Sequence, residues 1–503
     1  MLSLAGGLVH GSRADELVRT PYLQSATPDS IVIRWRTKTE NLGSVRYGSE
    51  PNNLGNSVTE PVPTREHVLQ LAHLAPSTTY FYSVGTSAET LAKGADCQFV
   101  TPPPPGQPKP TRIWVIGDSG VFNSGYGDVI SVRDAYYGFT RKHKTDLWLA
   151  LGDNAYLDGT DQEYQENFFE VFPWLLRQSP VWTTIGNHET YSSDAAGWFP
   201  YLDMFTLPTA AEAGGTASGT RRYYSFDYAN IHFVSLDSMT QSRGSNAPMA
   251  NWLRADLAAT TSPWIIAFWH HPPYSMGSHN SDYEYELIQM RENILPILEA
   301  RGVDLVLSGH SHNYERSFLL RGHYGKSSTL LPEMILDRGS GRERETGAYI
   351  KPLSGPLANQ GTVYIVNGSG GDAEDRDGHH PAMFMDEKQL GSLVVDVNSN
   401  RMDIAFLTRN STIADSFSII KADPEPLRLC SFNLRNGQTL ARWKSIRGRN
   451  YRVEQTEALG SGNWQPVGDP VVATGATTFW TNSAPQNGVW RFYRVTEGVS
   501  PHF

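Results

Sequence analysis

The sequence predicts a multidomain protein with an N-terminal β-sandwich, a central layered α/β domain with βαβ units and mixed sheets, and a small C-terminal β domain. At 503 residues the chain has room for roughly two to four domains. Before residue 101 and after residue 427, apolar and polar residues alternate as in antiparallel strands. Between residues 111 and 421, short apolar runs alternate with helical stretches, which is typical of an α/β domain.

The N-terminal region, residues 15–101, has the alternation of a β-sandwich. Ile31, Ile33 and Trp35 fall on one face of an expected strand. The segment 74–80, which ends in Tyr80, resembles the loop-and-tyrosine pattern of fibronectin type III sandwiches. The proline-rich segment 102–110 comes next, and consecutive prolines make an extended, semi-rigid spacer, so we expect a domain boundary there.

Residues 1–14 are interpreted as the remnant of a leader. Residues 2–9 are an apolar run, and the segment 12–14, Ser-Arg-Ala, resembles a small-residue cleavage site. The basic region that normally precedes such a run is missing, so a cloning boundary is the alternative. The interpretation favours a secreted or periplasmic protein.

The composition argues against two classes of partner. The net charge is −10, from 42 basic and 52 acidic residues without a basic block, so we expect no nucleic-acid partner. No apolar run is long enough to span a bilayer, so we expect no membrane partner. The two cysteines, Cys97 and Cys430, cannot form a zinc site by themselves, and their spacing does not tell whether they pair. The sequence leaves the oligomeric state open.

The most informative stretch is Gly-Asp-Asn-Ala-Tyr at residues 152–156, directly after the apolar run 147–151. A buried strand that ends in Gly-Asp leaves a carboxylate at the carboxyl edge of a sheet, where α/β proteins place their sites. Asp153 has two oxygens and can bridge two cations. Tyr156 can supply a phenolate, which suits a hard trivalent ion such as ferric iron better than zinc. Because Gly-Asp turns are common, the weight of this stretch depends on what surrounds it.

Other apolar runs of the same domain also end in residues that bind metals. Several such endings place hard ligands along one edge of a sheet, which unrelated turns would not do. The run 112–116 is followed by Asp118, the run 181–185 by Asn187 and His188, the run 264–269 by His270, and the run 304–307 by His310 and His312.

In order, these motifs resemble those of the purple acid phosphatases, which are calcineurin-like dinuclear metallophosphoesterases. The motifs are Gly-Asp-x-Gly at 117–120, Gly-Asp-x-x-Tyr at 152–156, Gly-Asn-His-Glu at 186–189, a strand ending in His270, and Gly-His-x-His at 309–312. The resemblance implies an acid phosphatase-type phosphoric monoester hydrolase that acts on a small phosphorylated substrate. In that family a metal-bound hydroxide is the nucleophile, and a histidine protonates the leaving group.

The resemblance also implies a ligand set and two cofactors, a ferric ion and a divalent metal that is iron, zinc or manganese. Carried over by position, the ferric ligands are Asp118, Asp153, Tyr156 and His312, and the divalent ligands are Asp153, Asn187, His270 and His310.

His188 and His279 are the expected catalytic residues, and together with Asn187 they are the expected substrate-binding residues. His188 directly follows a ligand, so its ring can reach a bound phosphoryl group. Plant-type members of the family carry two adjacent histidines where this chain has His279 and Asn280, which leaves the proton donor less clearly assigned. We predict His279 as the donor, with His188 assisting.

Three other segments are interpreted structurally. The apolar positions within 163–178 predict a helix that faces the core. The acidic and histidine-containing segment 372–380 is either a solvated loop or the rim of the substrate cleft, with a third cation as an alternative. In the C-terminal region, 427–503, tryptophans are expected in the core rather than on a carbohydrate-binding face.

Two alternatives to a monoesterase stay open. A phosphodiesterase or nucleotide pyrophosphatase would use the same metal site, because the shape of the cleft decides between these substrates. A binding protein with a relic site is more remote, since every expected ligand is present.

Overall fold

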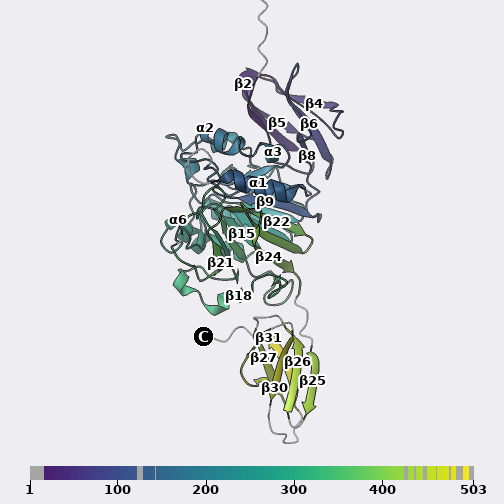
Figure 1. Ribbon diagram of the computed structural model, residues 1–503, viewed down its shortest axis with the longest axis vertical. Coiled ribbons are helices and arrows are strands. Elements are labelled where there is room, and N and C mark those ends of the chain that lie inside the picture. Colours follow the sequence, from purple (N-terminus) through teal and green to yellow (C-terminus); the bar gives the residue numbers. More distant parts are fainter. Residues whose placement is uncertain are drawn as a thin grey trace, which may run out of the picture. The chain divides into compact units, whose positions relative to one another are not determined.

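The computed structural model describes residues 16–121, 128–141, 143–375, 377–423, 429–435, 438–445, 450–459, 462–474, 477–482 and 491–497. The predicted leader at residues 1–14 lies outside the described residues. The chain divides into two compact units. Their strands and helices are labelled in Figure 1. The first comprises the chain up to Pro102 together with Phe172–Pro180, and the second comprises Pro103–Val171 and the chain from Val181 onward.

The first unit contains two antiparallel sheets that share one core. Buried side chains of both sheets, including Trp35 and Tyr82, pack together in this core. Tyr80 accepts a hydrogen bond at its hydroxyl from the backbone N–H of Ala75, 2.9 Å away, which closes the loop that the sequence pattern indicated. One sheet has the order β1 (Leu17–Gln24), β2 (Ile31–Asn41), β5 (Thr64–Leu71). The other has the order β4 (Asn56–Thr59), β3 (Gly43–Gly48), β6 (Thr79–Thr86), β7 (Thr90–Ala92), with β8 (Gln98–Val100) also paired to β6.

The first sheet of the second unit combines parallel and antiparallel strands. β9, β10 and β11 are parallel, and β22 joins β9 in the antiparallel direction. The order is β11 (Val181–Thr183), β10 (Leu147–Ala150), β9 (Thr111–Ile116), β22 (Gly391–Asn398), β23 (Arg401–Thr408), β24 (Ile413–Lys421), β19 (Tyr349–Lys351). The strands after residue 391 therefore complete the sheet that carries Asp118 and Asp153.

The second sheet of this unit has four neighbouring parallel strands, β13, β14, β15 and β20. Parallel strands buried on both faces are apolar throughout, as β14 and β15 are. The order is β12 (Tyr224–Tyr228), β13 (Ile231–Ser235), β14 (Trp264–Phe268), β15 (Leu305–Ser308), β20 (Val363–Asn367), β16 (Tyr314–Ser317), β21 (Met383–Glu387). Two short strands, β17 (Leu319–Leu320) and β18 (Ile335–Asp337), pair with each other in a separate two-stranded sheet.

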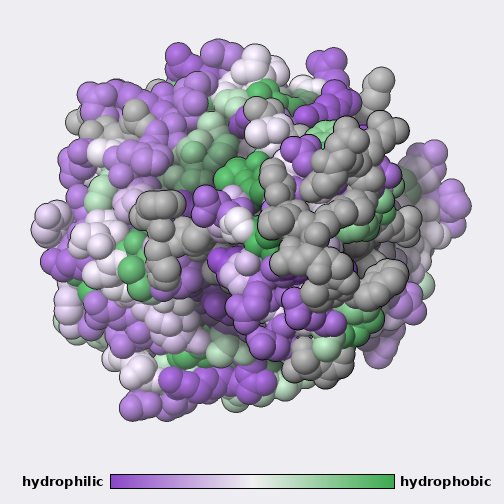
Figure 2. Space-filling model, turned by 90° about the horizontal axis from the view of Figure 1, so that it is seen from below, coloured by the Kyte–Doolittle hydropathy of each residue, from purple (hydrophilic) through white to green (hydrophobic). Residues whose placement is uncertain are grey.

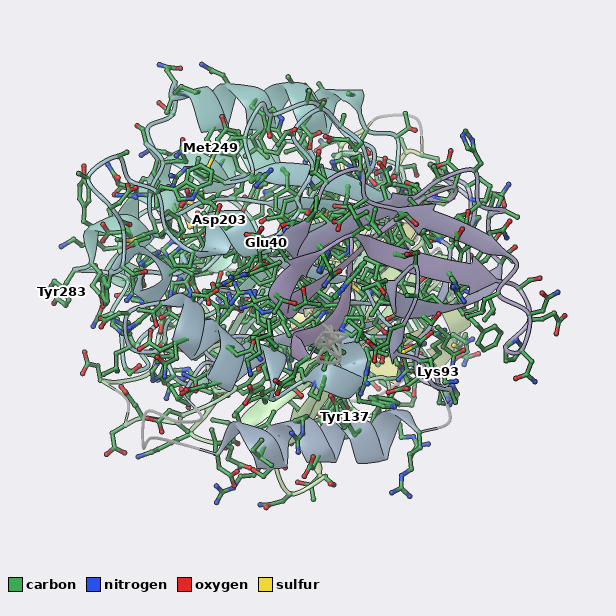
Figure 3. All side chains as sticks on the ribbon, turned by 90° about the horizontal axis from the view of Figure 1, so that it is seen from above. Glu40, Lys93, Tyr137, Asp203, Met249 and Tyr283 are labelled. Atoms are coloured by element: carbon green, nitrogen blue, oxygen red, sulfur yellow. The ribbon has the colours of Figure 1, made fainter. Side chains whose placement is uncertain are left out.

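Helices flank the two sheets. Seen from above, α5 (Pro248–Ala259), near the label of Met249, and α1 (Val129–Thr140), near that of Tyr137, lie on opposite sides of the strands (Figure 3). α5 packs with its buried Met249 and Leu253 into the apolar cluster over the second sheet. α6 (Tyr285–Gln289), a π-helical turn (Met290–Ile294) and α7 (Leu295–Glu299) follow one another, and α4 (Tyr201–Met204) is a single turn.

The prediction of a single helix over residues 163–178 is wrong. The structure has α2 (Asp161–Tyr164), a π-helical turn (Gln165–Phe169) and a separate α3 (Pro173–Leu176). Pro173 has no N–H and its ring clashes with a preceding turn, so it begins a helix rather than continuing one. Phe168 lies in the second unit, whereas Leu175 lies in the first.

The C-terminal strands enclose a small core of their own. Trp443 and Trp480 are buried in it, which confirms the interpretation for these two tryptophans. The interpretation is wrong for Trp464, which is half-buried beside the Arg494 guanidinium, and Trp490 lies outside the described residues. Its sheets have the orders β25 (Leu429–Arg435), β26 (Gln438–Lys444), β30 (Thr477–Asn482), and β28 (Gln465–Pro466), β27 (Asn450–Thr456), β29 (Val471–Val472), with β31 (Phe492–Glu497) paired to β27.

The surface seen from below is mostly polar, and the two cysteines differ in exposure. Seen from below, the coloured surface is mostly hydrophilic, with apolar side chains in small separate patches (Figure 2). Among the described residues, no helix is long and apolar enough to cross a membrane. Cys97 is a buried free thiol, and Cys430 is exposed.

Candidate metal centre

The predicted ligands lie at the carboxyl ends of strands from both sheets of the second unit. Asp118 and Asp153 follow β9 and β10 of the first sheet, and His270 and His310 follow β14 and β15 of the second. The backbone N–H of His310 donates to both carboxylate oxygens of Asp118, at 3.1 and 2.9 Å. The two sheet edges therefore meet at these residues.

One group of donor atoms surrounds the hydroxyl of Tyr156. This oxygen lies 3.3 Å from Asp118 Oδ1, 3.0 Å from Asp153 Oδ2 and 3.2 Å from His312 Nε2. His312 Nε2 lies 3.6 Å from Asp118 Oδ1. Ligand atoms at about 2.1 Å from one ion, with angles of about 90° to 120° between them, are roughly 3.0–3.6 Å apart, so this donor set fits a single ion. Three oxygens and one nitrogen form a hard donor set.

A second group surrounds the side-chain oxygen of Asn187. Asn187 Oδ1 lies 3.1 Å from His270 Nε2 and 3.1 Å from His310 Nδ1. His270 Nε2 also lies 3.3 Å from Asp153 Oδ2. Asp153 thus takes part in both groups, as a carboxylate that bridges two ions must. The structure brings all seven predicted ligands together, in the two sets that the resemblance implied.

Partners at the far side of each ring decide which histidine nitrogen faces the centre. His270 Nδ1 lies 2.9 Å from the carbonyl of Leu151, which can only accept, so Nδ1 carries the proton and Nε2 is left as a ligand. His312 Nδ1 lies 3.1 Å from Glu374 Oε1, which leaves its Nε2 for the first group. His310 Nε2 lies 3.3 Å from Glu284 Oε2, which leaves its Nδ1 for the second.

The site has a strongly negative local field. Burial lowers the pKa of His312, but hydrogen bonds to Asp118 and Glu374 outweigh this and raise it to about 10. Burial likewise opposes protonation of His270, but the nearby Asp153 and Asp118 carboxylates raise its pKa to about 9. Burial lowers the pKa of His310 to about 4. Such a field favours cations at the centre.

Three predicted ligands have unusual backbone conformations. Asp118, Asp153 and His310 have φ angles of 53°, 51° and 68°, in the left-handed region. Non-glycine residues in this region carry strain that tends to occur at functional sites.

Glycines allow the ligand loops to approach each other. A Cβ on Gly186 would lie 2.1 Å from Asp153 Oδ1, and one on Gly309 would lie 2.3 Å from Asp118 Oδ2. Both positions precede a predicted ligand, so the glycines of the Gly-Asn-His and Gly-His-x-His motifs are required by space.

The two predicted catalytic histidines contact different groups of donor atoms. His188 packs against Tyr156 with ring centroids 4.1 Å apart, and its Nδ1 is 2.6 Å from the carbonyl of Leu157. His279 stacks on His310 at 3.8 Å, and its Nδ1 is 2.8 Å from Glu284 Oε2. In each case Nδ1 is taken, and Nε2 is the nitrogen available to a substrate.

Two carboxylates near the site were not singled out from the sequence. Glu189 is fully buried and accepts hydrogen bonds from the backbone N–H groups of Asp153, Asn154 and Gly186 at 2.8, 2.7 and 2.6 Å. It follows His188 in the quoted motif, which was the available signal. Glu284 contacts both His279 and His310, and no pattern in the sequence distinguishes it.

The acidic segment 372–380 reaches the site through Glu374, the partner of His312. This contact joins the segment to a predicted ligand, and the three interpretations of the segment stay predictions. His380 is buried away from solvent, and His379 pairs with Asp386.

Comparison with known proteins agrees with this geometry. The family model described as calcineurin-like phosphoesterase matches residues 111–314, and the model described as the N-terminal domain of purple acid phosphatases matches residues 19–101. The chain is 28% identical over 375 residues to purple acid phosphatase 22 of Arabidopsis thaliana, covering 70% of this chain and 78% of the relative. It is 30% identical over 316 residues to a purple acid phosphatase of Glycine max, covering 57% of this chain and 62% of the relative.

A solved structure supports the fold. The purple acid phosphatase PPD1 from yellow lupin, Lupinus luteus, superposes with a TM-score of 0.63 at 18% identity, covering 80% of this chain and 74% of that chain. The fold and the facing ligand loops define a calcineurin-like metallophosphoesterase. Within that class, the chain is similar to the purple acid phosphatases, both in its N-terminal domain and over most of the length of the first curated relatives. It is therefore a metal-dependent phosphoester hydrolase of the acid phosphatase type, and this similarity implies a dinuclear metal site.

Proposed function

We propose that this protein hydrolyses phosphate monoesters at a centre of one ferric and one divalent ion, with iron, zinc or manganese as the divalent metal. The observation that carries the proposal is the phenol of Tyr156 among Asp118, Asp153 and His312, because a phenolate and two carboxylates suit ferric iron. The second group, with two histidines and the neutral Asn187, suits a divalent ion.

When bound, the metals supply Lewis acidity toward the phosphoryl oxygens and acidify the water that attacks phosphorus. The protein side chains do the rest. Asn187 and His188 orient the phosphoryl group from one side. On the other side, His279 donates its Nδ1–H to Glu284, which stabilises the imidazolium form and leaves the Nε2–H for the leaving-group oxygen.

The first test is the visible spectrum and the metal content of the purified protein. We expect a tyrosinate-to-iron charge-transfer band together with about two metals per chain. The Tyr156→Phe variant should lose the band while it keeps iron. A colourless wild-type protein with two divalent ions would contradict the ferric assignment, and a protein that binds no metal after reconstitution would contradict the whole proposal.

The second test concerns the substrate class. Metal-loaded protein should turn over p-nitrophenyl phosphate much faster than bis-p-nitrophenyl phosphate. The reverse order would favour the phosphodiesterase alternative, and absence of turnover on both by metal-replete protein would favour a relic site. The predicted export to a secreted or periplasmic location stays a prediction from the N-terminal sequence.

A further inference from the structure

The loop that carries His279, residues 275–280, is clamped between two other loops of the site. The backbone N–H groups of Asp377 and Gly378 donate to the carbonyls of Gly277 and Met276, at 2.8 and 3.0 Å. From the other side, the N–H of His312 donates to Ser278 Oγ at 2.9 Å. The position of His279 therefore depends on contacts outside its own loop.

The side chain of Asn313 connects these three loops. It is fully buried, directly after His312. Its Oδ1 accepts from the backbone N–H of Ser278 at 2.8 Å, and its Nδ2 donates to the carbonyl of Glu374 at 3.0 Å. One amide thus joins the loop that carries His279, the loop that carries His310 and His312, and the segment that carries Glu374.

Asn313 also acts on His279 through a second path. Its Oδ1 accepts from Ser311 Oγ at 3.2 Å, and Ser311 Oγ in turn lies 3.4 Å from the backbone nitrogen of His279. The fit is tight, because a Cβ on Gly277 would come within 2.2 Å of the same Oδ1. Glu315 fixes the beginning of the loop, where it accepts from the N–H of Met276 at 3.1 Å. Asn313 fixes its end.

We propose that Asn313 is a positioning residue that holds His279 where it can protonate the leaving group. This inference rests on the proposed function, in which His279 is the acid. As the bond between phosphorus and the leaving oxygen breaks, its electron pair goes to that oxygen, which takes the proton from His279 Nε2. Asn313 touches neither substrate nor metal. It sets the distance over which that proton moves.

The test compares substrates whose leaving groups differ in their need for a proton. General acid catalysis is worth about 10²–10⁴-fold, and a good leaving group such as p-nitrophenolate needs little of it. For Asn313→Ala we expect kcat on glycerol 2-phosphate to fall roughly 10- to 100-fold, but on p-nitrophenyl phosphate by less than about threefold. A merely structural defect would lower both rates equally.

A matched control is Asn230→Ala. Asn230 is also a buried asparagine of the same unit, and it directly precedes β13, at the end of that strand away from the site. It should lower both rates by the same factor, if at all. Metal content is measured for each variant, because Asn313 also contacts the segment of Glu374.

Two further variants keep the test decisive if Asn313→Ala folds poorly. Asn313→Asp retains the acceptor for Ser278 and should recover most of the rate on the alkyl ester. Gly277→Ala pushes the loop away from Asn313 and should reproduce the selective loss. Equal losses on both substrates, in all of these variants, would overturn the inference.

His279→Ala separates failure of this inference from failure of the proposed function. If His279→Ala shows the selective loss but the Asn313 and Gly277 variants do not, His279 is the acid and Asn313 does not position it. If His279→Ala shows no selective loss, the acid is assigned wrongly and the inference falls with it.

Discussion

The two sheets of the second unit contribute different chemistry to the same centre. The first sheet supplies oxygen donors, in Asp118, Asp153, Tyr156 and Asn187. The second supplies the nitrogen donors His270, His310 and His312. The strands of both sheets lie within the central part of Figure 1, where β9, β22 and β15 are labelled. The centre therefore forms only when both sheets are in place.

The oxygen side, formed by Asp118, Asp153, Tyr156 and Asn187, is held in place by buried groups of the protein. The buried Glu189 carboxylate accepts three backbone N–H groups from the loops after β10 and β11. Asp153 in turn accepts from the N–H of His188 at 2.9 Å. Because these partners are backbone groups in a buried setting, little on this side can move without leaving polar groups unpaired.

The nitrogen side is held largely by side chains near solvent. Glu374, with a side chain 48% exposed, orients His312, and Glu284, at 33%, contacts His279 and His310. Exposed pairs are weaker and more easily rearranged than buried ones. We infer that the oxygen donors are held rigidly, whereas the nitrogen donors can change position more easily.

The largest effect is expected at the residue that belongs to both groups of donors. Asp153→Asn removes the carboxylate that contacts both groups of donors, so we expect kcat to fall by about 10³-fold or more, since metal activation is worth several kcal/mol. Metal content should fall from about two to one or fewer per chain. Steady-state kinetics and elemental analysis of the same preparation measure both.

His312→Ala is the matched comparison for Asp153→Asn. It deletes a ligand of the first group alone, so the ion held by Asn187, His270 and His310 should remain. Equal loss of both metals in the two variants would contradict the shared role of Asp153.

The second-largest effect is expected at carboxylates that support the two sides, and it distinguishes the oxygen side from the nitrogen side. In Glu189→Gln, the amide nitrogen replaces one acceptor oxygen and leaves buried N–H groups unsatisfied, at about 1–3 kcal/mol each. We expect a lower unfolding free energy even without metal, and about 10- to 100-fold weaker metal binding. Glu374→Gln should weaken metal binding by about tenfold but leave the metal-free stability unchanged.

Titration calorimetry and urea unfolding of the metal-free proteins measure these two quantities. Asp375→Asn is the control for Glu374→Gln, since Asp375 is an exposed neighbour that pairs with Lys388 and not with a predicted ligand. If Glu374→Gln destabilised the metal-free protein as much as Glu189→Gln, the two sides would not differ as described.

Much of the site could be predicted because its residues follow apolar strands in short motifs. The carboxyl ends of parallel strands in one sheet meet at one edge, so position alone groups Asp118 with Asp153, and His270 with His310. The expectation of a single sheet edge was wrong, because the two pairs lie on different sheets whose edges meet. Tyr156 and Asn187 were candidates from ligand chemistry and position, whereas the division of the ligands between two ions came from the family resemblance.

The remaining features depend on tertiary contacts that no local pattern encodes. Glu284 and Glu374 reach the site from loops, and only their distances to His279 and His312 reveal them. The prediction of a single helix over 163–178 is wrong because it gave more weight to the apolar spacing than to Pro173, which begins a new helix. Asn313 is an unremarkable asparagine in the sequence, and its importance comes from three loops that converge on it.

The smallest effect on activity is expected at a histidine of the second sheet that does not face the centre. His232 on β13 lies 2.8 Å from Asp227 Oδ1 and 2.8 Å from Asp256 Oδ2. Burial lowers its pKa, but the two carboxylates outweigh this and raise it to about 9. Because the pKa is raised on folding, the stabilisation is complete below the unfolded value of about 6.5 and is lost as the pH rises through 9.

We therefore expect the pair of carboxylates around His232 to contribute about 3 kcal/mol of pH-dependent stability, lost between pH 6.5 and 9.5. Urea unfolding across this range, with constant metal content, should show a decline in wild type that is absent in His232→Asn. Burial lowers the pKa of Lys351 to about 8, which acts in the opposite direction as the pH rises, so the difference between the two proteins is the quantity to compare. The pH dependence of kcat should be the same in both. A changed kcat profile would mean that this histidine is coupled to the centre, and that the nitrogen side extends deeper into the second sheet than its ligand loops.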